Sequence, residues 1–72
     1  MLISGWFETE EGAGFIEVSD VDTAGDLACI LYATYGVEVV GVDMELEGEY
    51  TDGTDVNTTM TELVEELEAL TS

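Results

Sequence analysis

The stretch VGVDMELEGEY, residues 40–50, alternates apolar or small residues with acidic ones. A period of two predicts a β-strand with one face in a core and the other in water. Residues two apart on a strand point the same way and lie ~6.6–7 Å apart, so four such acids form a line ~20 Å long. We call these four residues the acidic row: Asp43, Glu45, Glu47 and Glu49.

The charge of the whole chain has one sign. Its 72 residues include 18 Asp and Glu and no Lys, Arg or His, which gives a net charge of −18. Neighbouring carboxylates of the acidic row lie within the Debye length of ~8 Å at physiological salt, so they repel one another. A solvated strand face normally mixes signs, because opposite charges across strands stabilise a sheet. The unmixed row therefore favours a surface that meets a cationic partner.

The size of the charge is comparable with that of a nucleic acid. Duplex DNA carries one charge per ~1.7 Å of axis, so eighteen charges correspond to ~31 Å of duplex. A folded chain of this length has a radius of gyration of ~11 Å, hence a diameter near ~29 Å. The protein is predicted to carry about as much negative charge as a DNA duplex of its own length.

The chain is predicted to fold as a single domain over residues 1–72. Its apolar fraction of 46% is ordinary for a globular protein, whereas disordered chains combine high charge with few apolar residues. No apolar run approaches the roughly 18 residues of a membrane span, and a basic start typical of a signal peptide is missing. The single cysteine, Cys29, cannot form an internal disulfide, which favours a reducing, cytoplasmic location.

The expected elements follow the order ββαβα. Strands over 2–8 and 15–19, joined by a turn that contains glycine, predict a hairpin. We then expect a helix within 19–36, a long strand over 37–50 with a bend near 39–41, a loop over 51–55 and a helix over 56–70. This order predicts a two-layer α+β domain, in which both helices cover one face of a three-stranded sheet.

Residues typical of helix ends mark both predicted helices. Ser19 or Asp20 is expected to cap the first helix, and Gly36 to end it in the left-handed conformation. In the last helix, Thr59 and Glu62 have the spacing of a capping box, although that helix can also begin a turn earlier.

The last helix carries acids where its dipole disfavours them. Glu65, Glu66 and Glu68 lie in its C-terminal half, and Glu62 forms a like-charge pair with Glu66 at i, i+4. Lysine at these positions would stabilise the helix. The sequence gives up stability to keep the sign of the surface uniform.

The stretch WFETEEGAGFI, from Trp6 to Ile16, resembles the first nucleic-acid-binding motif of cold-shock domains. The resemblance implies a five-stranded OB-like barrel with a C-terminal helix as the alternative fold, in which residues 26–32 would be a strand. It also implies that Trp6 and Phe15 stack on bases. The basic residues of that family are acids here, and a charge of −18 repels nucleic acid. We therefore expect no direct nucleic-acid binding, and interpret Trp6, Phe7 and Phe15 as packing in the hairpin.

Neither catalysis nor a metal site is predicted, and no cofactor is expected. The chain has no His or Lys for base chemistry and no Arg to hold an oxyanion, and Cys29 has no cationic neighbour to form a thiolate. Asp20, Asp22 and Gly25 match three positions of a calcium-binding EF-hand loop, but Leu31 stands where that loop needs a glutamate.

In size and charge, the chain resembles the small acidic DNA-mimic inhibitors, many of them phage-encoded, which act against restriction enzymes, CRISPR effectors and repair enzymes. The resemblance implies that it occupies the basic groove of a host nucleic-acid-binding protein, in the cytoplasm of an infected cell if it is phage-encoded. Trp6 or Tyr50 is a candidate aromatic anchor for such a partner. The predicted partner-binding residues are the acidic row with acids of the hairpin and the last helix: Asp43, Glu45, Glu47, Glu49, Glu8, Glu10, Glu11, Glu62, Glu65 and Glu66.

Two alternatives remain open at this point. The chain could be an acidic protein-interaction module, or a structural domain of a halophile, without DNA mimicry. It could also form a homodimer through an exposed edge of the third strand.

Overall fold

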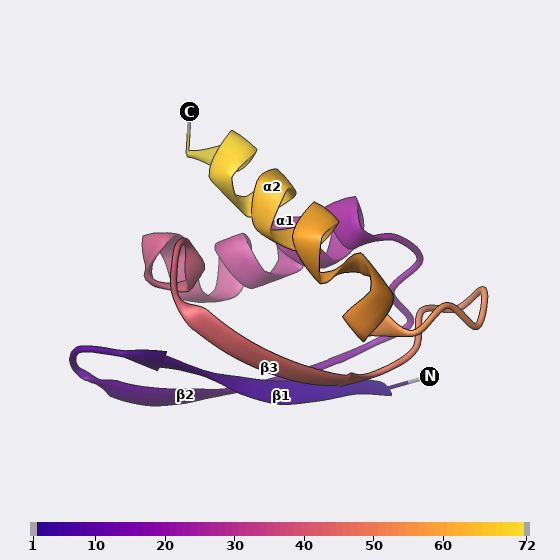
Figure 1. Cartoon of the computed structure of the whole chain (residues 1–72), viewed down its shortest axis with the longest axis horizontal. Helices are drawn as coiled ribbons and strands as arrows, with labels where there is room; N and C mark the ends of the chain where they lie inside the picture. Colours follow the sequence, from indigo (N-terminus) through magenta and orange to yellow (C-terminus); the bar gives the residue numbers. More distant parts are fainter. Residues whose placement is uncertain (1, 72) are drawn as a thin grey trace.

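A three-stranded antiparallel sheet forms one layer of the protein, and two helices form the other (Figure 1). The computed structural model describes residues 2–71. Its elements are β1 (Leu2–Thr9), β2 (Gly12–Ser19), α1 (Ala24–Tyr35), the 3₁₀ helix η1 (Gly36–Val39), β3 (Asp43–Gly48), the 3₁₀ helix η2 (Val56–Thr59) and α2 (Met60–Leu70). The predicted ββαβα order and α+β class are confirmed. The alternative OB-like barrel is wrong, because residues 26–32 lie in α1 rather than in a strand.

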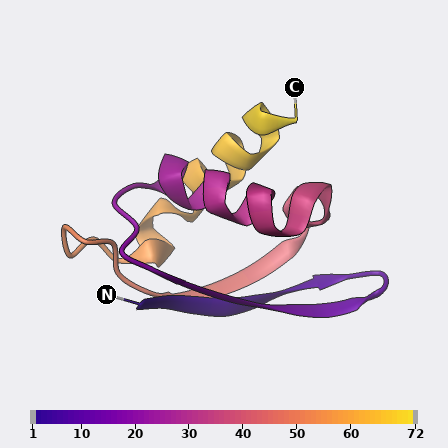
Figure 2. The ribbon, with the colours of Figure 1, turned by 180° about the vertical axis from the view of Figure 1, so that it is seen from behind.

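The strand order β2-β1-β3 places the first strand in the middle of the sheet. Phe7 pairs with Gly14 on one side and with Met44 on the other, and Ile3 pairs with Val18 and Gly48. These residues face the helices, because alternate residues of a strand point to opposite faces. The views from front and back agree that both helices lie on this one side of the sheet (Figures 1 and 2).

The hairpin between β1 and β2 turns through only two residues. Thr9 pairs with Gly12, so Glu10 and Glu11 form the whole loop. Two-residue loops usually need residues with positive φ. Here the positive φ is found at Gly12, at +140°, and not at either of the two glutamates. The Thr9 hydroxyl accepts a hydrogen bond from the Glu11 N–H at 3.2 Å and donates one to the Gly12 carbonyl at 3.0 Å.

Thr23 caps helix α1, with its Oγ1 accepting a hydrogen bond from the Asp26 N–H at 3.1 Å. The prediction of Ser19 or Asp20 as the cap is wrong. Asp20 has φ +56°, and residues 20–22 carry the chain from the end of β2 to the helix layer. The sequence correctly indicated a polar N-cap for this helix, but the predicted cap lies a few residues before the real one.

The third strand is much shorter than the predicted strand over 37–50. Gly36 ends α1, as predicted, and its N–H donates to the Tyr32 carbonyl. Its φ of +71° is positive, but its ψ of −149° lies outside the left-handed helical region that was expected. The chain then forms η1 and a turn at Val40–Gly41, and β3 begins only at Asp43. Val39, within η1, is buried. Val39, Val40 and Val42 pack in or against the core, whereas Val37 is 64% exposed. This packing overrides the preference of the valines for extended structure.

The core lies between the sheet and the two helices. The Phe7 ring packs edge-on against Tyr35 of α1, with ring centroids 5.1 Å apart and planes at 67°. Tyr50, 2% exposed, forms a hydrogen bond with Thr59 Oγ1 at 2.6 Å. Its burial excludes Tyr50 as a surface anchor. The buried residues are Ile3, Phe7, Ile16, Val21, Ala24, Leu27, Ala28, Leu31, Val39, Leu46, Tyr50, Val56, Leu63 and Leu67.

The last helical segment begins one turn earlier than the capping-box spacing suggests, because the 3₁₀ helix η2 directly precedes α2. Asp55 caps η2 by accepting a hydrogen bond from the Asn57 N–H at 2.8 Å. Thr59 stands immediately before α2, but its hydroxyl does not cap that helix. It bonds Tyr50 and the Val56 carbonyl instead, so the capping box is not formed on the Thr59 side.

Candidate anionic interface

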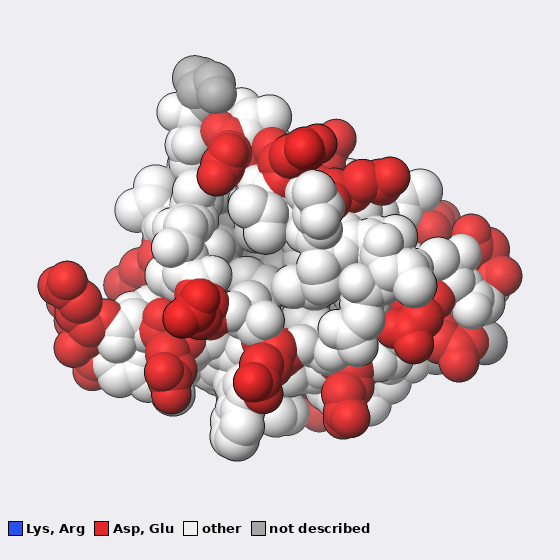
Figure 3. All heavy atoms as spheres, viewed as in Figure 1, with Lys and Arg blue, Asp and Glu red and all other residues white. Residues whose placement is uncertain are grey.

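All eighteen acidic side chains are exposed, and they all lie in the part of the chain that the structure describes. No charged side chain of residues 2–71 is buried. This follows from composition, since burying a carboxylate without a cationic partner costs several kcal/mol or forces its protonation. Figure 3 shows acidic side chains around much of the visible outline, with uncharged surface between them.

Three residues of the acidic row lie on β3 and point away from the helices. Asp43, Glu45 and Glu47 are exposed, and they alternate with Met44 and Leu46, which face the core. The two-residue spacing predicted from the sequence is therefore present over this stretch. Glu49 is exposed too, but it lies beyond the end of β3 and forms an isolated bridge with Asp55. The strand contributes a row of three acids, with the fourth on the adjoining loop.

Glu8 extends the row across the sheet. It is the last residue of the predicted first strand, and it lies within β1, directly opposite Asp43. Side chains in such a pair have Cβ atoms ~4.5–5.5 Å apart, and like charges there destabilise a sheet. A lysine at either position would make the pair favourable. The like-charge pair therefore indicates that the choice of an acid at both Glu8 and Asp43 is not explained by stability alone.

Sequence reasoning missed Glu17, which belongs to the same face. Glu17 of β2 pairs with Ser4 of β1, and Ser4 pairs in turn with Glu47 of β3. The signal was the hairpin register: once Thr9 pairs with Gly12, Glu17 must point to the same side as Glu8. We define the open face as the strand residues that point away from the helices: Leu2, Ser4, Trp6, Glu8, Ala13, Phe15, Glu17, Ser19, Asp43, Glu45 and Glu47.

Two large aromatic side chains lie at the centre of the open face. Trp6 is 57% exposed and Phe15 is 62% exposed, and the two residues are partners across β1 and β2. The interpretation of Trp6, Phe7 and Phe15 as residues packed in the hairpin is confirmed for Phe7, which is buried. It is wrong for Trp6 and Phe15, because both side chains are exposed. The reason is parity, since Phe7 faces the helices and its neighbour Trp6 must face the other way.

The Trp6 side chain is held against β3. Its indole Nε1–H donates a hydrogen bond to Glu45 Oε2 at 3.1 Å. Beside it, a shallow hollow is lined by Trp6, Glu8, Asp43, Met44 and Glu45. The aromatic ring and three carboxylates thus border one small region at the β3 side of the open face.

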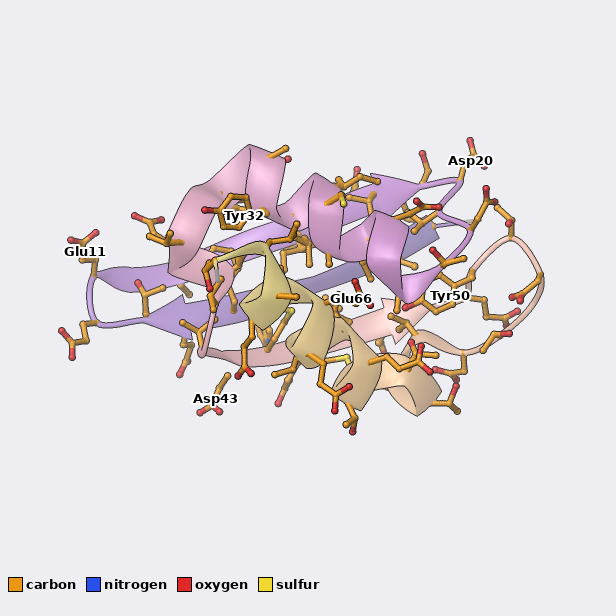
Figure 4. The ribbon with its side chains drawn as sticks, turned by 90° about the horizontal axis from the view of Figure 1, so that it is seen from above. Glu11, Asp20, Tyr32, Asp43, Tyr50 and Glu66 are labelled. Carbon is orange, nitrogen blue, oxygen red and sulfur yellow. The ribbon has the colours of Figure 1, made fainter. Side chains whose placement is uncertain are left out.

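The other predicted acids lie elsewhere on the molecule. Glu10 and Glu11 form the hairpin turn, at the far end of the sheet (Figure 4). Glu62, Glu65 and Glu66 lie on α2, in the layer on the other side of the sheet from the open face. The structure therefore divides the predicted partner-binding residues among the open face, the loop at Glu49, the hairpin turn and α2. Of the ten, it places Asp43, Glu45, Glu47 and Glu8 on the open face.

The loop before η2 contains a carboxylate with a perturbed pKa. The Thr54 N–H donates a hydrogen bond to Asp52 Oδ1 at 2.9 Å. This bond favours the charged form and lowers the pKa of Asp52 below its usual value. Asp52 lies outside the open face, so this shift concerns the loop and not the row.

The carboxylates are spread out rather than gathered into a chelating group. Within residues 2–71, no three Asp, Glu or Cys side chains come close enough together to hold a metal ion. Over the same residues, no helix has the length and apolarity needed to cross a membrane.

No family model matches the chain, and no curated protein or solved structure has significant similarity to it.

Proposed function

We propose that this protein is a DNA mimic, which inhibits a nucleic-acid-binding protein by occupying its basic groove. The observation that carries the proposal is that all eighteen carboxylates are exposed on a body 33 Å long that has no Lys, Arg or His. Eighteen phosphates occupy ~31 Å of duplex, so the two charge densities along the long axis are similar.

The spacing of the row on β3 adds support. The two-residue repeat of a strand, ~6.6–6.8 Å, is about twice the 3.4 Å axial rise per phosphate of one DNA strand. Asp43, Glu45 and Glu47 thus form a row of anions with a regular two-residue spacing on a hydrogen-bonded scaffold. Lysines and arginines that are placed to meet phosphates can meet these carboxylates instead.

The placement of acids at unfavourable positions is a second line of support. Glu8 and Asp43 face each other across two strands, and Glu65, Glu66 and Glu68 lie in the C-terminal half of α2. A stable domain of this fold needs none of these charges. Selection for a uniformly anionic surface accounts for all of them together.

The mechanism of inhibition is competition. Uniform charge attracts a cationic groove from a distance and speeds encounter, and this attraction weakens with salt. The partner class is a host defence or DNA-processing protein, with CRISPR effectors and restriction enzymes as the narrower proposal from the resemblance of size and charge. The chain would act there without binding nucleic acid itself.

The test is a competition that separates DNA geometry from mere acidity. The chain is immobilised, proteins of a bacterial extract are captured at 50 mM NaCl, and the column is eluted with duplex DNA or with poly-glutamate at equal total charge. We expect the retained proteins to be nucleic-acid binders that leave at a lower concentration of DNA charge than of poly-glutamate charge. Equal displacement by the two polymers, or retention of basic proteins that bind no nucleic acid, would support the acidic interaction module instead.

A further inference from the structure

The open face combines exposed aromatic rings with carboxylates on the β3 side and at both ends of the cluster. Trp6 and Phe15 are cross-strand neighbours, and each has more than half of its surface in water. Both helices lie on the other side of the sheet (Figure 1), so neither of them covers these rings. Exposed apolar clusters that are rimmed by polar residues mark interaction surfaces more often than isolated exposed residues do.

The Trp6 ring is oriented before any partner arrives. Its hydrogen bond to Glu45 Oε2, at 3.1 Å, fixes the indole on the β3 side of the face. That bond uses one lone pair, and a carboxylate accepts several hydrogen bonds, so Glu45 can still take a further donor. A side chain that is already oriented loses little conformational entropy on binding.

The neighbours of Trp6 decide the chemistry of the occupant. Glu45 stands beside it on β3, and the Glu8–Asp43 pair lies two residues further along the strands. Glu17 and Glu47 lie at the opposite side, on either side of Ser4. An aromatic face bordered by carboxylates suits a flat, delocalised cation that stacks on the ring and also donates several hydrogen bonds. The arginine guanidinium has these properties, whereas the lysine ammonium offers a compact charge without a flat face.

Other occupants fit poorly. A second copy of this chain brings another −18 charge, and its own open face would place five carboxylates against five. Nucleic acid offers bases that could stack on Trp6, but its phosphates would meet the same carboxylates. An uncharged apolar surface would leave these anions desolvated without partners, which is costly.

We infer that the open face receives arginine side chains from the groove of the partner, with one guanidinium stacked on Trp6 and hydrogen-bonded to Glu45. The inference rests on the proposed function, because it takes the partner to be a basic nucleic-acid-binding protein. It adds a position for the strongest contact, and a preference for arginine over lysine.

The test uses the full chain with two probes of equal charge, an arginine hexapeptide and a lysine hexapeptide. Affinities are measured by calorimetry at constant ionic strength. Trp6 is the only tryptophan, so its emission reports directly on the proposed contact. We expect the arginine peptide to bind at least about threefold more tightly than the lysine peptide, and to shift the Trp6 emission at saturation.

Three variants separate the contact from general attraction. Glu45→Gln and Glu65→Gln both change the net charge from −18 to −17, and the side-chain amide of Glu45→Gln still offers an oxygen to the Trp6 indole. Glu45→Gln should remove most of the preference for arginine, whereas Glu65→Gln, on α2, should weaken the binding of both peptides equally. Trp6→Val, which suits an exposed strand position, should also abolish the preference. Far-UV circular dichroism checks that each variant keeps its fold.

Equal affinity for the two peptides, an unchanged Trp6 emission, or equal losses in Glu45→Gln and Glu65→Gln would overturn the inference. If those results came with efficient displacement of captured proteins by duplex DNA, the proposed function would stand and the arginine contact would be elsewhere. A clear preference for arginine without displacement by DNA would keep the contact and overturn the mimicry.

Discussion

The Phe7 ring lies directly over Gly14 on the neighbouring strand. A Cβ added at Gly14 would come within 2.3 Å of Phe7 Cζ, far inside van der Waals contact. The ring also packs edge-on against Tyr35 of α1. One glycine thus makes the room that lets the first hairpin and the first helix share an aromatic contact.

Gly14→Ala should therefore destabilise the protein by ~1–3 kcal/mol, because the added methyl group overpacks the core and displaces the ring. Urea unfolding measures the change in the free energy of unfolding. In a Phe7→Leu background the same substitution should cost much less, since the ring is gone. Equal costs in both backgrounds would mean that the ring is not what excludes the methyl group.

The N-cap of α1 gives a second stability prediction. Thr23→Ala removes the hydrogen bond that Thr23 Oγ1 accepts from the Asp26 N–H, and should cost ~0.5–2 kcal/mol. Ser19→Ala, at the cap expected from sequence, should change the free energy of unfolding much less. Chemical denaturation of the two variants side by side makes the comparison, and a larger loss in Ser19→Ala would place the cap there.

The Glu8–Asp43 pair predicts a variant with opposite effects on stability and on partner binding. Glu8→Lys turns a like-charge pair into an opposite-charge pair and should stabilise the fold by ~0.2–1 kcal/mol. It also changes the net charge from −18 to −16, and should weaken capture of basic proteins. Glu8→Gln is the control that removes the repulsion without adding attraction. A loss of stability in Glu8→Lys would show that this pair is not a site of repulsion.

The Asp52 carboxylate should stabilise the fold at neutral pH and lose this effect in acid. The hydrogen bond from the Thr54 N–H lowers the pKa of Asp52 in the fold, so its contribution is complete above the unfolded value of about 4 and is lost as the pH falls below it. Asp52→Asn should therefore lower the melting temperature more at pH 7 than at pH 3. Melting temperatures of the two proteins at both pH values and fixed ionic strength test this, and an equal difference at pH 3 and pH 7 would contradict it.

Salt should stabilise the chain without being required for folding. Screening shortens the range of repulsion between exposed carboxylates, from a Debye length of about 30 Å at 0.01 M to about 10 Å at 0.1 M. We expect the circular dichroism spectrum of a folded domain at 10 mM NaCl, with a melting temperature that rises by 0.5 M. A chain that is unfolded at 10 mM NaCl and folds only at molar salt would instead support the halophilic structural domain.

Much of the fold could be predicted because local and tertiary preferences agree in most segments. Gly36 ended the first helix as expected, and the two strands of the hairpin were recognisable. Segment 37–42 was predicted only in part. The bend expected near 39–41 is present as the turn at Val40–Gly41, but the valines favoured a strand where the chain forms η1, in which Val39 is buried. Alternation alone cannot reveal where a chain must change layers.

Only part of the candidate site could be predicted, because the rest depends on the register of the β1–β2 hairpin. The parity of Asp43, Glu45 and Glu47 could be read directly from the sequence. The positions of Glu8 and Glu17 depend on a two-residue turn, whereas the sequence suggested a longer one over residues 9–14. The same register brings Trp6 opposite Phe15 and turns both of them outward, which their aromatic character argued against.

Because β3 is hydrogen-bonded to β1, the middle strand of the sheet, the alignment of the acids exists only while the sheet is intact. A denatured copy of this molecule has identical composition and titratable groups, yet its carboxylates have no fixed positions relative to one another. Comparing the two forms as ligands would measure how much recognition comes from shape and how much from charge alone.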